Sequence, residues 1–159
     1  MDAALATVIR KNEGERRASN MPDYAAARAG FSWDTARARL RGLPGGGLNI
    51  ACEAVDRHVE DGAGSQLAIR WIAKDLQRRD FTYADLAAAS SRFANVLQTN
   101  GIARADAVFS LLGRVPELYA AALGTWKAGA VFAPLFSQFG PEPLKARMAI
   151  GDAAALVTS

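Results

Sequence analysis

The sequence predicts an α/β protein that forms the start of a doubly wound, mostly parallel sheet with crossover helices. Two observations predict this class. Apolar strands alternate with helices over residues 107–159, as in parallel sheets built from crossover units. These strands are apolar at nearly every position, which is typical of strands buried on both faces. Half of the 159 residues are hydrophobic and 22% are charged, so the chain can form a core rather than remain disordered.

The first part of the chain differs from this pattern. Residues 1–48 read as an irregular helical segment, with turns at Met21–Asp23 and at Gly30. The stretch LPGGGLN, from Leu43 to Asn49, breaks regular structure and is typical of a linker. We therefore predict a helical segment and linker over residues 1–48 and a separate domain that begins at residue 49.

The next elements are a helix and a β-hairpin. Asn49 can cap a helix over residues 50–60, because its side chain can accept a hydrogen bond from the first free amides. Residues 67–72 alternate as in a strand, with a turn near residues 74–77 and a return strand over residues 81–83.

A long helix is expected to follow the hairpin. Thr82 and Asp85 have the spacing of a capping box, and Asn100–Gly101 is a typical helix end. The helical period predicts a core-facing set, namely Leu86, Ala89, Phe93, Val96 and Leu97.

Two crossover units complete the chain. Strands are predicted at residues 107–113, 130–136 and 154–159, and the helices between them start at Pro116 and Pro141. Trp126 is predicted to face the sheet, and Lys127 to face solvent near the helix C-terminus. Since a doubly wound sheet normally has further strands, we expect this sheet to be incomplete.

Charge, cysteine content and hydropathy argue against several classes of partner and of fold. The net charge of +3 comes from residues 1–49, where the arginines at positions 37, 39 and 41 would spread around a helix rather than form a stripe. We therefore predict no nucleic-acid partner. The single cysteine excludes an internal disulfide framework. With no signal peptide and no long apolar run, we expect no membrane partner and a cytoplasmic location.

Few residues suggest chemistry directly. Gly113, between a strand and a helix, could mark a phosphate loop or a plain connection. A lone glycine followed by Glu117 favours the connection, because a carboxylate in the first helical turn repels phosphate. His58 is the only histidine, and no G-x-S-x-G element accompanies it. We predict no catalytic residue and no metal site.

The stretch LFSQFGPEP, from Leu135 to Pro143, is the best candidate site. It follows a predicted central strand, at the sheet edge where open α/β sheets bind ligands. The alternative is a connection whose phenylalanines only pack against each other.

Several segments together resemble the adenylate-forming acyl-CoA synthetases, and most closely the acetate-type CoA ligases. The resemblance spans about residues 47–159 and is carried by stretches such as NIACEAVDRH, SRFANVLQTNGI, GRVPELYAAALGTWKAGAVFAPLFSQFGPEPLKAR and DAAALVTS. It implies that residues 49–159 are the first part of the family's AMP-binding domain, and that the rest of the same polypeptide follows.

The resemblance also implies a reaction. A small carboxylic acid attacks the α-phosphate of ATP to give an acyl-adenylate and pyrophosphate, and CoA then takes the acyl group. ATP, CoA and Mg²⁺ are the implied cofactors of the full-length enzyme. In the family the phosphate loop, ribose carboxylate and catalytic lysine lie downstream of the segment present here, so no catalytic residue is assigned. We expect the 159-residue chain to be inactive by itself and to bind none of the cofactors tightly.

One binding region follows from the resemblance. In acetate-type relatives the loop after the second crossover strand lies beside the CoA nucleotide, which implies this role for Phe136, Ser137 and Gln138. Relatives often have a Gly-Gly pair where this sequence has Ser137–Gln138.

Two alternatives stay open. The chain could be a non-catalytic remnant that acts as a protein-interaction module through its unfinished sheet. A dehydrogenase-type dinucleotide fold is a further alternative, although no G-x-G-x-x-G follows any strand.

Overall fold

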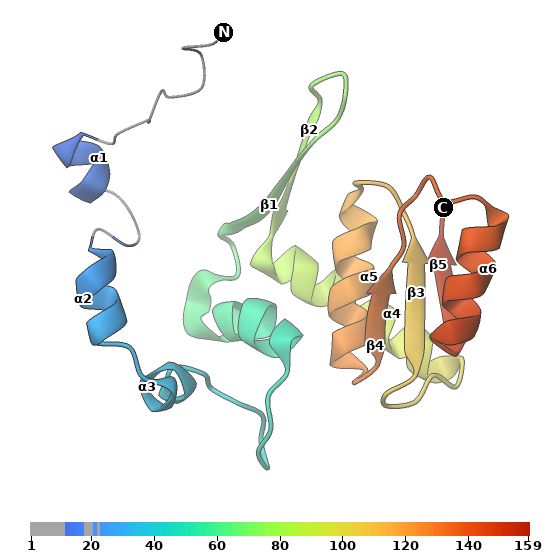
Figure 1. Cartoon of the computed structure of the whole chain (residues 1–159), viewed down its shortest axis with the longest axis horizontal. Coiled ribbons are helices and arrows are strands. Elements are labelled where there is room, and N and C mark those ends of the chain that lie inside the picture. The colour runs from blue at the N-terminus through green and yellow to red at the C-terminus, as the bar shows by residue number, and fades with distance from the viewer. Residues whose placement is uncertain (1–11, 18–20, 22) are drawn as a thin grey trace, which may run out of the picture. The chain divides into compact units, whose positions relative to one another are not determined.

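The computed structural model describes residues 12–17, 21 and 23–159 (Figure 1). These fall into two compact units, which divide between Leu40 and Arg41. Residues 41–48 belong to the second unit, and the predicted boundary after residue 48 stays a prediction. The predicted turn at Met21–Asp23 includes Pro22, which lies outside the described residues.

The described residues of the first unit form three short helices, as the irregular helical pattern predicts. These are α1 (Glu13–Arg17), α2 (Tyr24–Ala29) and α3 (Trp33–Ala38). Side-chain caps begin the second and third, because Asp23 accepts a hydrogen bond from the amide of Ala26 and Ser32 from the amide of Thr35.

The second unit opens with the predicted helix after Asn49. The Asn49 side chain accepts a hydrogen bond from the amide of Ala51 at 2.9 Å, which supports the predicted cap. The helix contains two π-helical segments, η1 (Cys52–Asp56) and η2 (Val59–Ala63). Gly62, with φ of 85°, kinks the second segment, and this conformation strongly favours glycine.

The hairpin and the long helix follow in the predicted order. Strand β1 (Leu67–Ile72) pairs antiparallel with β2 (Arg78–Thr82), and α4 spans Tyr83–Thr99. The capping box between Thr82 and Asp85 is confirmed. The predicted return strand, residues 81–83, begins and ends later in the sequence than β2. This cap starts the helix at Tyr83, so strand pairing ends at Thr82.

A three-stranded parallel sheet carries the rest of the chain. The strands are β3 (Ala107–Leu111), β4 (Val131–Pro134) and β5 (Ala153–Thr158), in the order β4-β3-β5. Helix α5 (Pro116–Lys127) connects β3 to β4, and α6 (Pro141–Ile150) connects β4 to β5. Strands β4 and β5 lie on opposite sides of β3. The direction in which successive strands are added to the sheet therefore reverses at β3, as in doubly wound folds.

The two faces of the sheet pack differently. Val108 packs against Leu97 of α4, whereas Phe109, which points to the other face, lies beneath Gly151 at the end of α6. On the first face, α4 packs against α5, and the two helices cross in the view of Figure 1. Their contact requires Gly124, because a Cβ there would lie 2.6 Å from the carbonyl oxygen of Ser90.

The core-facing side of α4 differs slightly from the prediction. Leu86 and Leu97 are buried as predicted, but Val96 is exposed and Ser90 is buried in its place. The Ser90 hydroxyl donates to the carbonyl of Leu86 at 2.6 Å, so its burial leaves no polar group unsatisfied.

Trp126 faces the sheet, as predicted. It packs against the cluster of Ala51, Val55, Leu86 and Leu123, and its ring meets Phe132 of β4 edge-on at 6.0 Å. Because the side chain is half-buried, we expect Trp126→Ala to lower the free energy of unfolding by about 2–4 kcal/mol, near the lower end for Trp→Ala changes. Urea unfolding measures this value, and a loss below about 0.5 kcal/mol, typical of surface sites, would contradict the packing.

The described sheet is open, in agreement with the prediction of an incomplete α/β fold. Its two outer strands, β4 and β5, each pair only with β3 among the described residues. Large apolar side chains are exposed nearby, namely Val131, Leu156 and Ile150, the last of them 87% exposed. No described helix has the length and apolar character needed to cross a membrane.

Candidate functional site

The loop after β4 lies at the carboxyl edge of the sheet, where the three strand arrows point in Figure 1. It is tied to the central strand, because the amide of Leu135 donates to the carbonyl of Ser110 at 2.8 Å. A tight turn follows, in which the amide of Phe139 donates to the carbonyl of Phe136 at 3.0 Å. The turn leaves Phe136, Ser137 and Gln138 exposed, and Phe136 is 60% exposed.

Aromatic and cationic groups fix this turn against α6. The rings of Phe136 and Phe139 meet edge-on at 5.6 Å, and the guanidinium of Arg147 lies 4.3 Å from the centre of the Phe139 ring. Arg147 also donates to the carbonyl of Pro143 at 3.1 Å. The turn therefore presents one exposed ring and two polar side chains, and a cation lies beside the second ring.

The loop after β3 is held by the hairpin. The indole Nε1 of Trp71 donates to the carbonyl of Arg114 at 2.8 Å, and Arg79 lies 3.9 Å from Glu117 at the start of α5. Gly113 is exposed, and its missing side chain leaves open space. These contacts agree with a connecting role for this loop, which stays a prediction.

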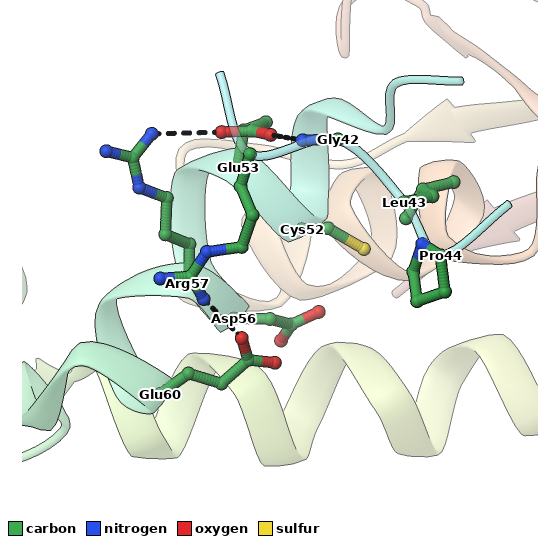
Figure 2. Close-up of a pocket in the computed structure, with 9 residues that line it drawn as sticks. Gly42, Leu43, Pro44, Cys52, Glu53, Asp56, Arg57 and Glu60 are labelled. Carbon is green, nitrogen blue, oxygen red and sulfur yellow. Dashed lines mark hydrogen bonds and ion pairs between the residues drawn. The ribbon is translucent and has the colours of Figure 1, made fainter. Parts of the chain in front are cut away.

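Sequence reasoning missed a cavity of about 450 Å³ beside η1. Figure 2 shows its charged wall around the carboxylates of Glu53, Asp56 and Glu60. Arg41 bridges Glu60 and Asp61, and Arg57 pairs with Glu53 at 3.1 Å. The cavity forms where the linker folds back on the helix, so no short motif in the sequence marks it.

Cys52 contributes its thiol to this wall (Figure 2). Burial raises the pKa of the thiol, and the neighbouring carboxylate of Asp56 raises it further. The thiol therefore stays protonated near neutral pH, which disfavours a role as a nucleophile.

Lys127 corrects one expectation, since the sequence predicted that its side chain faces solvent. Instead, the Lys127 ammonium donates to Asp56 at 2.6 Å, and the Lys127 side chain is only 10% exposed. It also donates to the carbonyl of Ala87 at 3.3 Å and to the hydroxyl of Ser91 at 3.1 Å, so all three ammonium hydrogens have acceptors.

Glu53 makes the stability of the fold depend on pH. The amide of Gly42 donates to Glu53 at 2.7 Å, and this bond, followed by the bond from Arg57, lowers the pKa of Glu53 below its ordinary value of 4.5. A lowered folded-state pKa stabilises the fold above the ordinary value, and the contribution is lost as the pH falls through the folded value.

We expect Glu53→Gln to be less stable than the parent chain at pH 7, with a difference that shrinks below about pH 4.5. Urea midpoints measured between pH 7 and pH 3 check this. The matched control is Glu142→Gln, at an exposed position on α6. A Glu53→Gln difference that stays constant across this range would contradict the assignment.

His58 lies against an aromatic ring. His58 stacks on Tyr83, with ring centres 4.6 Å apart, and so serves as a packing residue. Within residues 12–17, 21 and 23–159, no group of three or more His, Cys, Asp or Glu side chains is placed to hold a metal ion.

Comparison with known proteins decides the family. The family model described as AMP-binding enzyme matches residues 57–159, which include both crossover units and the loop after β4. The chain belongs to the AMP-binding enzyme family.

Named relatives of this chain agree with that assignment. It is 39% identical over 128 residues to an acetyl-coenzyme A synthetase of Halorhodospira halophila, a match that covers 80% of this chain and 20% of the relative. It is 34% identical over 142 residues to an acetyl-coenzyme A synthetase of Bacillus subtilis, covering 88% of this chain and 24% of the relative. The resemblance to acetate-type CoA ligases is thereby confirmed.

A solved structure supports the fold of this chain. The crystal structure of an acyl-CoA synthetase of Brucella canis has a TM-score of 0.77 and 38% sequence identity, covering 85% of this chain and 24% of that chain. This chain therefore spans about a fifth to a quarter of the length of the proteins it matches.

Proposed function

We propose that this chain is the N-terminal portion of an ATP-dependent ligase for acetate or another short-chain acid. The whole protein would convert the acid, ATP and CoA to acyl-CoA, AMP and pyrophosphate through an acyl-adenylate. The observation that carries the proposal is identity of 34–39% to acetyl-coenzyme A synthetases over 80–88% of this chain. We also propose a cytoplasmic location, where ATP and CoA are available to the enzyme.

Within this protein, the loop after β4 is proposed to hold the nucleotide end of CoA. The residues present fit such a group. The exposed Phe136 ring can stack on a base, the side chains of Ser137 and Gln138 can form hydrogen bonds, and Arg147 adds a positive charge nearby. CoA supplies the thiol that accepts the acyl group, and this loop would bind and orient its distant end.

Adenylate formation is proposed to depend on the remainder of the polypeptide. Residues 1–159 contain no glycine-, serine- and threonine-rich run of the kind that wraps phosphate oxygens. The proposed remainder would bind ATP with Mg²⁺ and stabilise the charge that develops on the phosphates. Reading the coding sequence beyond Ser159 tests this directly, and a phosphate loop is expected within the next few tens of codons.

A kinetic experiment on the complete polypeptide tests the proposed function. Acyl-CoA formation is followed with acetate, propionate and butyrate, each in the presence of ATP and CoA. We expect activity with at least one acid, and we expect Phe136→Ala to raise the KM for CoA by roughly tenfold, as for loss of one stacked base. The absence of thioester with all three acids would contradict the function.

The open sheet favours a second candidate function, a protein-interaction module without catalysis. Unpaired strand edges and exposed apolar side chains such as Val131 and Ile150 can pair with another chain. Sedimentation of the 159-residue chain beside the complete polypeptide separates the candidates. Association of the short chain that disappears in the complete polypeptide would indicate that the rest of the same protein covers these edges.

A further inference from the structure

The β-hairpin contacts the loop between β3 and α5 through two side chains. The indole Nε1 of Trp71 donates to the carbonyl oxygen of Arg114 at 2.8 Å. Arg79 lies opposite Trp71 in the strand pairing. Its guanidinium lies 6.0 Å from the centre of the Trp71 ring, and its Nη1 atom is 3.9 Å from a carboxylate oxygen of Glu117. The hairpin therefore holds both the loop and the first turn of α5.

The loop has little else to fix it between the buried residues Leu112 and Pro116. Gly113 is exposed, and nothing lies within 4 Å of the place that its Cβ would occupy. Val115, the N-cap of α5, makes no side-chain capping bond, so it lacks the stabilisation that a serine or aspartate supplies there. In the part of the chain that the structure describes, the bond from Trp71 is the only hydrogen bond that joins residues 113–115 to an element other than α5.

The position of this loop connects it to the ligand edge of the sheet. It follows β3, the central strand, which has β4 on one side and β5 on the other. Open α/β sheets bind ligands in the crevice outside the carboxyl ends of the strands at such a switch point. The loop would form one wall of that crevice. Since the sequence predicts no phosphate binding by the loop, its contribution would be the shape of the wall.

We propose that Trp71 is a positioning residue for acyl-adenylate formation, because its hydrogen bond fixes the wall of the site for the acid and ATP. The proposal rests on the proposed function and deepens it, since it gives the hairpin a role in the first half-reaction. The nucleotide end of CoA is proposed to lie at the loop after β4, so the wall after β3 is assigned to the other two substrates. Reacting groups have to be held within about 0.5 Å of the productive geometry. Release of the wall would therefore slow the chemical step in a folded enzyme.

The test compares Trp71→Phe with the matched control Arg70→Gln in the complete polypeptide. Phenylalanine keeps an aromatic ring but has no N–H donor. Arg70 bonds to Asp80 across the same hairpin at 2.7 and 2.8 Å, and its side chain points to the opposite face from Trp71. The control therefore removes a hairpin interaction without removing the bond to the loop.

The burst of enzyme-bound acyl-adenylate is measured with saturating acid and ATP, with pyrophosphatase and without CoA. Its amplitude counts folded active sites, whereas its rate constant reports the chemical step. We expect Trp71→Phe to lower the rate constant by roughly tenfold, as for a small misplacement of the site, and to leave the amplitude unchanged. Arg70→Gln should change neither quantity. Tryptic cleavage after Arg114 measures the mobility of the loop itself and should be faster in Trp71→Phe than in the parent enzyme and the control.

A Trp71→Phe burst that is reduced only in amplitude would overturn the proposal, because Trp71 would then have a purely structural role. An unchanged rate constant, unchanged cleavage after Arg114, or equal slowing by Arg70→Gln would overturn it as well. Slowing confined to thioester formation after CoA is added would show that the wall serves the second half-reaction instead, and this too would overturn the proposal. Absence of the burst from the parent enzyme would overturn the proposed function, and this proposal with it.

Discussion

Replacing Gly124 by valine is expected to lower the free energy of unfolding of the chain by about 3 kcal/mol, at the upper end of ordinary overpacking effects. A Cβ at this position would lie 2.6 Å from the carbonyl oxygen of Ser90 and 2.9 Å from two atoms of Phe93. The nearest obstacle is backbone, which cannot move aside as a flexible side chain can. Helices α4 and α5 must therefore separate, and their packing is lost along the whole contact.

Gly113→Val is the matched control for this prediction. Gly113 lies in the loop before α5, and nothing stands within 4 Å of the position that its Cβ would occupy. We expect this change to stay within about 0.5 kcal/mol, as for most surface substitutions. Urea unfolding measures both variants, and equal effects of the two valines would contradict the close approach of α4 and α5.

Lys127→Met is expected to cost about 2–4 kcal/mol, because it leaves the carboxylate of Asp56 without its cation. The Lys127 ammonium is largely buried and makes three hydrogen bonds to groups of η1 and α4. Methionine keeps much of the side-chain volume, so the loss reports the charge and hydrogen bonds rather than a cavity. Asp56 retains some exposure to water, which limits the cost.

The double variant Lys127→Met with Asp56→Asn provides the control. Replacing the unpaired carboxylate of Asp56 by a neutral amide should restore part of the stability, since a buried pair can be replaced by neutral groups at small cost. Chemical unfolding of both single variants and the double variant gives the coupling free energy. Additive effects with no coupling would show that the two side chains do not interact.

Local signals in the sequence predict much of the fold. The prolines that start α5 and α6 and the Thr82–Asp85 capping box act through the backbone of their own helix, so reading them requires no knowledge of distant residues. Apolar strands likewise predict the parallel sheet, because burial on both faces requires such a composition.

Contacts between distant residues could not be predicted in this way. Lys127 and Asp56 are 71 positions apart, and only the packing of α5 against the π-helical segment brings them together. The helix end suggested a lysine in solvent, but the tertiary environment buries it. The same reason explains the missed cavity, whose wall joins the linker near Arg41 to the helix at Glu60.

One feature of the candidate loop could be predicted from the sequence and another could not. Its place after a strand could be predicted from the order of elements, and the structure puts Phe136 in an exposed position at the sheet edge. The stacking of Arg147 on Phe139 depends on how α6 turns back over the loop. A pattern of one residue type at a fixed spacing does not encode that geometry.

Acetate-dependent exchange of labelled pyrophosphate into ATP tests the central claim most directly. It reports acyl-adenylate formation by the enzyme without any contribution from CoA. The account predicts exchange by the complete polypeptide with acetate, propionate or butyrate, and none by purified residues 1–159. Exchange by the 159-residue chain, or its absence from the complete polypeptide with all three acids, would contradict the account.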